Sequence, residues 1–207
     1  MQKSQYDKKR LTSANIIDYI KEQYGSNAII KSKDYYKIPN IKALLQKDYG
    51  KDNDCTITSL TTCLFYKIPE KNPQEIYNIV EAHGEKNHFY NGKLYGTIPI
   101  FIKCIYDKCL KTLGINLKSK SAYFKGIGYS FEKLKTILKT QTPVILSIPS
   151  DGRDYYSDHS ITVIGYVTYL INETESIDFL LVYDNWSTVI SYVDFKKINV
   201  LSCINYL

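Results

Sequence analysis

A cysteine, a histidine and an aspartate occur in an order that suits nucleophilic catalysis by a thiol. Cys55 follows Asp54 at the expected beginning of a helix. The thiolate is the reactive form of cysteine, and the unpaired N–H groups and partial positive charge of a helix N-terminus stabilise it. The sequence therefore predicts that Cys55 is a nucleophile.

His159 and Asp184 supply the other two groups that such chemistry needs. His159 begins an alternating segment and Asp184 ends the next expected strand. Adjacent strands lie about 5 Å apart, so the Asp184 carboxylate can accept a hydrogen bond from the imidazole and orient it. We expect a Cys55–His159–Asp184 triad with a resting thiolate–imidazolium pair. Two alternatives stay open: Asp184 as a plain strand-end cap, and Asn185 as the orienting residue.

The elements that must position these residues change character halfway along the chain. The first half predicts helices over residues 14–24 (with Ser13 as N-cap), from residues 52–54 to 67, from 72–73 to 84, and over 97–113. The second half predicts a short helix after Ser130 and strands over residues 144–148, 159–170, 177–184, 186–195 and 199–206. Helices followed by antiparallel strands indicate an α+β fold with two lobes.

Composition narrows the function classes. The chain has 207 residues, of which 44% are apolar and 23% charged, which is typical of a soluble globular protein. The five cysteines are an odd number without a C-x-x-C pair, so we expect no disulfide framework, no metal site and no cofactor. The net charge of +6 is spread along the chain and predicts a solvated surface rather than a nucleic-acid partner.

The sequence also gives an expectation about the cellular location of the protein. No apolar run approaches the roughly 18–20 residues of a membrane span, and the basic first ten residues lack the apolar region of a signal peptide. We therefore expect no membrane span and favour the cytoplasm. The oligomeric state is left open.

Three short motifs resemble those of papain-like cysteine peptidases. Most similar is the bacterial branch that includes the double-glycine leader peptidases of bacteriocin exporters and their stand-alone relatives. The motifs are Asp54-Cys55-Thr56-Ile57-Thr58-Ser59, His159-Ser160-Ile161-Thr162-Val163-Ile164-Gly165-Tyr166 and Asp184-Asn185-Trp186. The resemblance covers roughly residues 36–195.

This resemblance implies a fold, an activity and further site residues. The fold would be papain-like over residues 35–207, with a helical N-terminal lobe and an antiparallel sheet in the C-terminal lobe. Residues 1–34 would form an N-terminal extension with a helix, either a propeptide or a decoration. The activity would be hydrolysis of a peptide or protein substrate through a thioester acyl-enzyme. Asn185 and Trp186 would support the triad, Asn185 as a spacer and Trp186 as a ring over the histidine.

Departures from the motif pattern leave alternatives. The family's oxyanion glutamine usually lies six residues before the nucleophile, where this chain has Tyr49, and Gln46 is the candidate substitute. A catalytically inactive, peptide-binding module is therefore one alternative. An acyltransferase or deamidase using the same triad is another, because it shares the thioester intermediate.

Overall fold

The computed structural model of the chain describes residues 9–49, 53–93, 96–149, 155–156 and 158–207. These residues form an α+β fold, as the sequence predicts. Their main sheet has eight strands in the order β1-β9-β8-β7-β6-β10-β5, with β2 also paired to β7. Every strand pair in this sheet is antiparallel.

Three helices and a short hairpin form the helical lobe. They are α2 (Cys55–Lys67), α3 (Pro73–Lys86), α4 (Ile102–Thr112), β3 (Tyr90–Asn91) and β4 (Gly96–Thr97). The side chain of Asn72 accepts a hydrogen bond from the Gln74 N–H, and Pro73 occupies the first helical position, so α3 begins where the sequence predicts.

Helix α2 lies at the centre of this lobe, with residues 56–64 all buried. A buried helix tolerates hydroxyl side chains when each finds a partner. Thr61 and Thr62 meet this condition by donating to backbone carbonyls four residues earlier, at 2.8 and 3.0 Å. This explains how a helix of modest hydrophobicity can be enclosed on all sides.

The second lobe is built on the main sheet. Its strands are β1 (Leu11–Thr12), β2 (Ile30–Lys37), β5 (Lys120–Tyr123), β6 (Val144–Ile148), β7 (His159–Ile171), β8 (Glu175–Tyr183), β9 (Ser191–Asp194) and β10 (Cys203–Tyr206). Two helices accompany them, α1 (Ile16–Tyr24) and α5 (Phe131–Lys139). Three 3-10 turns complete the described elements, namely η1 (Gln46–Asp48), η2 (Pro99–Phe101) and η3 (Phe195–Lys197).

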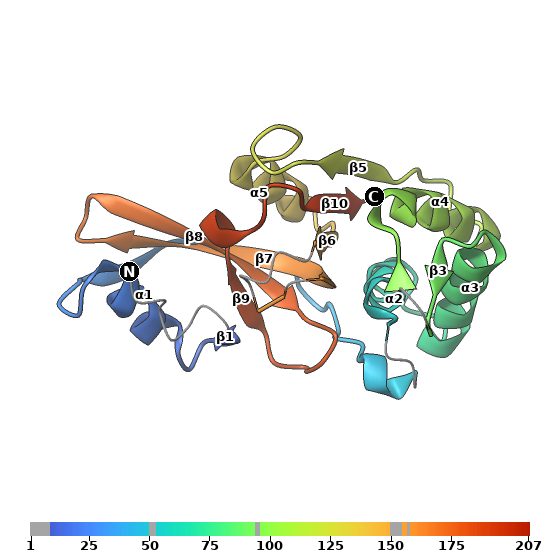
Figure 1. Cartoon of the computed structure of the whole chain (residues 1–207), viewed down its shortest axis with the longest axis horizontal. Helices are drawn as coiled ribbons and strands as arrows, with labels where there is room; N and C mark the ends of the chain where they lie inside the picture. The colour runs from blue at the N-terminus through green and yellow to red at the C-terminus, as the bar shows by residue number, and fades with distance from the viewer. Residues whose placement is uncertain (1–8, 50–52, 94–95, 150–154, 157) are drawn as a thin grey trace.

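Strand β7 joins the parts of the molecule. One edge pairs with β8, with a register shift between Val163 and Gly165, while the other pairs first with β6 and then, from Gly165 onward, with β2. Helix α2 packs against β6 and β7. In Figure 1, α2 is the helix of its lobe nearest the sheet, and the long β7–β8 hairpin extends to the opposite end, where α1 lies. The start of β7, which carries His159, therefore faces the lobe that carries Cys55.

Several sequence-based element boundaries are wrong. Helix α1 begins at Ile16 with Asn15 at its N-cap position rather than Ser13, because the Asn15 side chain accepts from the Thr12 N–H. Strand β9 begins at Ser191 instead of residue 186, and α4 begins at Ile102 after the 3-10 turn η2. The first ten residues of β7 are all buried, so its apparent alternation does not mark a solvent-facing side.

The close approach of β2 to β7 yields a stability prediction. A Cβ at Gly165 would lie 2.3 Å from the Tyr36 carbonyl oxygen, whereas one at Gly114 would meet nothing within 4 Å. We expect Gly165→Ala to lower the free energy of unfolding by about 1–3 kcal/mol through this clash. We also expect it to speed amide exchange at Ile38, whose N–H bonds the Ile164 carbonyl.

Gly114→Ala is the matched control. Its positive φ of 70° makes an alanine cost about 1–2 kcal/mol, but the strain stays local. Chemical denaturation and hydrogen exchange of both variants check the prediction. Unchanged exchange at Ile38 in Gly165→Ala would contradict it.

Candidate active site

Cys55 and His159 line one cavity between the two lobes. Its volume is about 360 Å³, and Gln46 and Trp186 contribute to its wall. The remaining lining residues are Asn53, Thr56, Gly96, Thr97, Pro99, Ser147, Ile148, Pro149, Asp158 and Ser160. The structure thus brings a thiol and an imidazole from separate lobes to one cavity.

Cys55 is the first residue of α2 and is half-buried. Burial raises the pKa of its thiol. The Ser160 N–H and the Thr56 N–H and hydroxyl lower this pKa by hydrogen bonding to the sulfur, while the charge of Asp54 raises it. The net direction is upward, so the donors at the helix start do not offset burial.

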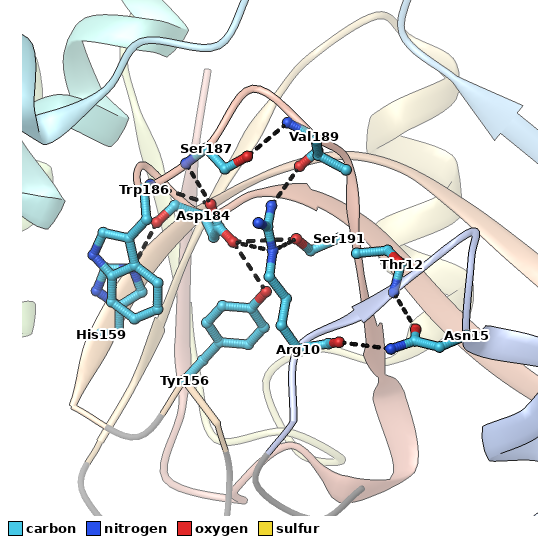
Figure 2. A network of polar contacts seen from close by, with 10 residues as sticks. All are labelled: Arg10, Thr12, Asn15, Tyr156, His159, Asp184, Trp186, Ser187, Val189 and Ser191. Carbon is cyan, nitrogen blue, oxygen red and sulfur yellow. Dashed lines mark hydrogen bonds and ion pairs between the residues drawn. The ribbon is translucent and has the colours of Figure 1, made fainter.

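The imidazole of His159 is held in one tautomer. Its Nε2 lies 2.8 Å from the backbone carbonyl oxygen of Asp184. A carbonyl can only accept, so Nε2 carries the proton of the neutral ring and Nδ1 is left as the basic nitrogen. Trp186 stacks on the ring with centroids 4.1 Å apart (Figure 2).

Burial also lowers the pKa of His159 below its ordinary value of 6.5. The hydrogen bond to the Asp184 carbonyl and the charges of Asp184 and Asp158 oppose this change. Together with the raised pKa of Cys55, this favours a neutral thiol beside a neutral imidazole. The resting ion pair expected from the sequence is therefore not favoured, because both charged forms would be desolvated.

The Asp184 carboxylate does not contact His159, which corrects the sequence-based role of that group. Its Oδ1 accepts from the N–H groups of Trp186 and Ser187, each at 3.1 Å, which forms an Asx turn. Its Oδ2 faces Arg10, Ser191 and Tyr156 (Figure 2). Asp184 contacts the histidine through its backbone carbonyl instead, because the turn aims the side chain the other way.

Asn185 ties the two lobes together rather than touching the imidazole. Its Nδ2 lies 3.0 Å from the Cys55 carbonyl, 2.9 Å from the Ser59 hydroxyl and 2.9 Å from the Ser160 carbonyl. The backbone carbonyl of Asn185 accepts a hydrogen bond from the backbone N–H of Gln46 at 2.9 Å. Asn185 adopts a φ of 65°, a conformation that asparagine tolerates better than most residues.

Gln46 reaches the cavity from the turn η1. Its Nε2 donates to Asp54 Oδ1 at 2.9 Å, and Tyr77 donates to Asp54 Oδ2 at 2.9 Å. Tyr49, at the position where the family usually has glutamine, instead stacks on Tyr77 with ring centroids 3.9 Å apart. The turn therefore directs Gln46, and not residue 49, toward the site.

A chain of buried hydroxyls that sequence reasoning missed links the nucleophile's helix to the histidine's strand. Thr56 donates to Ser160 at 2.8 Å, and the Ser160 hydroxyl lies 2.8 Å from that of Ser147. Thr56 directly follows Cys55 and Ser160 directly follows His159 within the motifs, and this adjacency is the one signal that could have singled them out. Arg10 was also missed, since nothing in its local sequence points to Asp184.

The described residues also bear on metal binding and on membrane insertion. They contain no group of three or more His, Cys, Asp or Glu side chains placed to hold a metal ion. No helix among them is long and apolar enough to cross a membrane.

Comparison with known proteins identifies the family of the chain. A search of curated proteins found no match to the chain. The model of the Peptidase C39-like family matches residues 35–199, a range that includes Cys55, His159 and Asp184. The chain therefore belongs to the Peptidase C39-like family, a family of papain-like cysteine peptidases.

Proposed function

We propose that the chain is a cysteine peptidase in which Cys55 is the nucleophile and His159 the general base. The observation that carries the proposal is the hydrogen bond from His159 Nε2 to the Asp184 carbonyl. It leaves Nδ1 as the basic nitrogen of a ring that shares a cavity with Cys55. Family membership supports peptidase activity independently.

The proposed reaction begins with a neutral pair. Nδ1 of His159 takes the thiol proton as the Cys55 sulfur attacks the substrate carbonyl, and the resulting imidazolium then protonates the leaving amine. A water molecule, activated by the same nitrogen, hydrolyses the thioester and releases the acid. The Asp184 carbonyl accepts from Nε2 throughout and stabilises the transient imidazolium.

Two donors are proposed for the oxyanion formed in each step. One is the Cys55 backbone N–H at the start of α2, and the other is the side-chain amide of Gln46. Gln46 lines the same cavity as Cys55 and His159, and its amide is held by the bond to Asp54, which supports this assignment. This arrangement favours an active enzyme over the inactive, peptide-binding alternative.

The motif resemblance also suggests which class of peptide is the substrate. We propose leader peptides that end in two glycines, and a pair of peptides differing only by Gly-Gly or Ala-Ala before the scissile bond would test it. Adding a primary amine to the assay separates hydrolysis from acyl transfer, because transfer gives an amide product and hydrolysis gives the free acid.

Removing either reacting group should abolish turnover. We expect Cys55→Ala to give no hydrolysis above background and His159→Ala to lower kcat/KM by about 10²–10⁴-fold, the usual contribution of a general base. Cys104→Ser is the matched control, because Cys104 is also half-buried but lies in α4 outside the cavity. Full activity in Cys55→Ala would overturn the proposed function.

The pH dependence should report the lowered pKa of His159. Protonated His159 cannot accept the thiol proton, so kcat/KM falls as the pH drops through this pKa, which burial places below 6.5. Among the described residues, the charged or titratable groups near the ring are Asp184, Asp158, Cys55 and Tyr156.

Trp186→Ala should shift the acidic limb of the pH profile, which is the range in which kcat/KM falls as His159 becomes protonated. Loss of the stacked ring admits water, relieves desolvation and raises the His159 pKa toward 6.5, so the limb shifts to higher pH. Profiles of kcat/KM against pH for both proteins check the sign. An acidic limb above pH 6.5 in the unaltered protein, or a shift to lower pH in the variant, would contradict it.

Asn185 should matter for both stability and turnover. Asn185→Ala removes the amide group that contacts the Cys55 carbonyl, the Ser59 hydroxyl and the Ser160 carbonyl. The loss leaves buried partners unsatisfied, which we expect to lower the free energy of unfolding by about 1–3 kcal/mol. The positive φ adds about 1–2 kcal/mol for alanine.

Asn185→Gly separates these two effects, because glycine adopts the same φ without strain. We expect denaturant unfolding to rank the unaltered protein above Asn185→Gly and that above Asn185→Ala, with both variants slower in hydrolysis. Equal stability of all three proteins would show that the amide does not join the lobes.

A further inference from the structure

The Asp184 carboxylate is fully buried, and its cationic partner comes from the N-terminal segment. The Arg10 Nε lies 2.8 Å from Asp184 Oδ2, in an ion pair whose arginine side chain is 23% exposed and whose aspartate is not exposed at all. The other groups facing this carboxylate are neutral: the hydroxyls of Ser191 and Tyr156 and two backbone N–H groups. Arg10 therefore supplies the positive charge that a buried carboxylate requires.

Arg10 is itself held in place on three sides. Its Nε contacts the Ser191 hydroxyl and its Nη2 donates to the Val189 carbonyl, each at 2.7 Å. Its backbone carbonyl accepts from Asn15 Nδ2 at 3.1 Å, at the start of α1 (Figure 2). The next two residues form β1, which pairs with β9. The guanidinium is thus fixed by its own segment and by the loop after Trp186.

The turn fixed in this way is the one that orients the imidazole. Asp184 Oδ1 accepts from two N–H groups of the turn while Oδ2 contacts Arg10, so one carboxylate anchors both. The carbonyl of the same residue accepts from His159 Nε2, and the ring of Trp186 covers the imidazole. Loss of the cation would leave a buried charge that must either take up a proton or move toward water.

We propose that Arg10 is a positioning residue for His159 and acts through the Asp184 turn. Residues 10–24, which hold Arg10 in place, then contribute to the activity of the enzyme. The inference rests on the proposed function for its catalytic meaning. Arg10 does not touch substrate or the reacting atoms. Its role is to keep the Asp184 carbonyl and the Trp186 ring in the places that direct Nδ1 toward the cavity.

On this proposal residues 10–24 are not a removable propeptide. A propeptide that blocks a cleft is cleaved to give activity, whereas Arg10 contacts the far side of the turn and none of residues 10–24 lines the cavity. Removal of residues 1–24 should lower activity instead of releasing it.

The test compares substitutions at Arg10 with two matched controls. Arg10→Met removes the charge and Arg10→Lys keeps it without the planar fork. Lys31→Met removes the cation of an exposed ion pair with Glu173, 3.1 Å long, and controls for net charge. Tyr19→Phe removes a buried hydrogen bond from α1 to Asp194 and controls for weaker docking of the segment.

Two readouts separate positioning from stability. One is the split of kcat and KM in peptide hydrolysis, measured well below the melting temperature of every variant. The other is the pH profile of Cys55 alkylation by iodoacetamide, followed by peptide mapping, with Cys55→Ser as the baseline. Alkylation needs no substrate, so it reports on the imidazole and thiol even if the proposed peptidase activity fails.

We expect Arg10→Met to lower kcat by about 10–100-fold, the usual cost of losing a group that orients a reacting residue, with KM nearly unchanged. Its alkylation profile should shift, Arg10→Lys should recover part of kcat, and both controls should keep the unaltered values. In an Asp184→Asn background Arg10→Met should add little, because the two residues act as one unit.

Three results would overturn the inference. They are an Arg10→Met variant with unaltered kcat and alkylation profile, a Tyr19→Phe variant with the same loss of kcat, and full additivity with Asp184→Asn. A wild-type protein that cleaves no peptide yet shows the Arg10-dependent alkylation profile would instead refute the proposed function and leave the positioning role standing.

Discussion

The turn formed by Asp184, Asn185 and Trp186 is the constraint on which the site depends. Three adjacent residues orient the imidazole, tie the helix of Cys55 to the strand of His159, and cover the imidazole ring. The thiol and the imidazole belong to different lobes, so their separation is set by whatever fixes one lobe against the other. Buried hydrogen bonds do this well, because a low-dielectric setting strengthens each bond and penalises its loss.

Two fully buried carboxylates flank the reacting pair, and they are stabilised in different ways. Asp54 has neutral donors in Gln46, Tyr77 and Thr58, and burial raises its pKa. Asp184 has a guanidinium. The difference bears on the proposed chemistry, since the negative charge of Asp54 next to the sulfur disfavours a thiolate at rest. Proton transfer to His159 then accompanies attack instead of preceding it.

The sequence predicts the parts of this site that depend on local signals. The start of α3 follows from its capping residue Asn72, whereas the side chain of Asp54 makes no capping hydrogen bond to α2. The motifs single out Cys55 and His159, which line one cavity. Burial is not visible in the sequence: the helix start favours a thiolate, whereas burial raises the pKa of the Cys55 thiol. The contact between Arg10 and Asp184 spans nearly the whole chain, and no periodicity or cap marks it.

The sequence also does not show whether residue 184 contacts the histidine through its backbone or through its side chain. The contact through the backbone explains why an aspartate suits the position. An asparagine could also accept from the N–H groups of Trp186 and Ser187 and form the same turn. It could not neutralise the guanidinium that reaches the turn from the N-terminal segment. The carboxylate therefore acts on the imidazole indirectly. It fixes the turn, and the turn positions the backbone carbonyl of Asp184 against His159 Nε2. A peptide carbonyl accepts a hydrogen bond without a formal charge, which fits a histidine that burial keeps neutral until the thiol proton arrives.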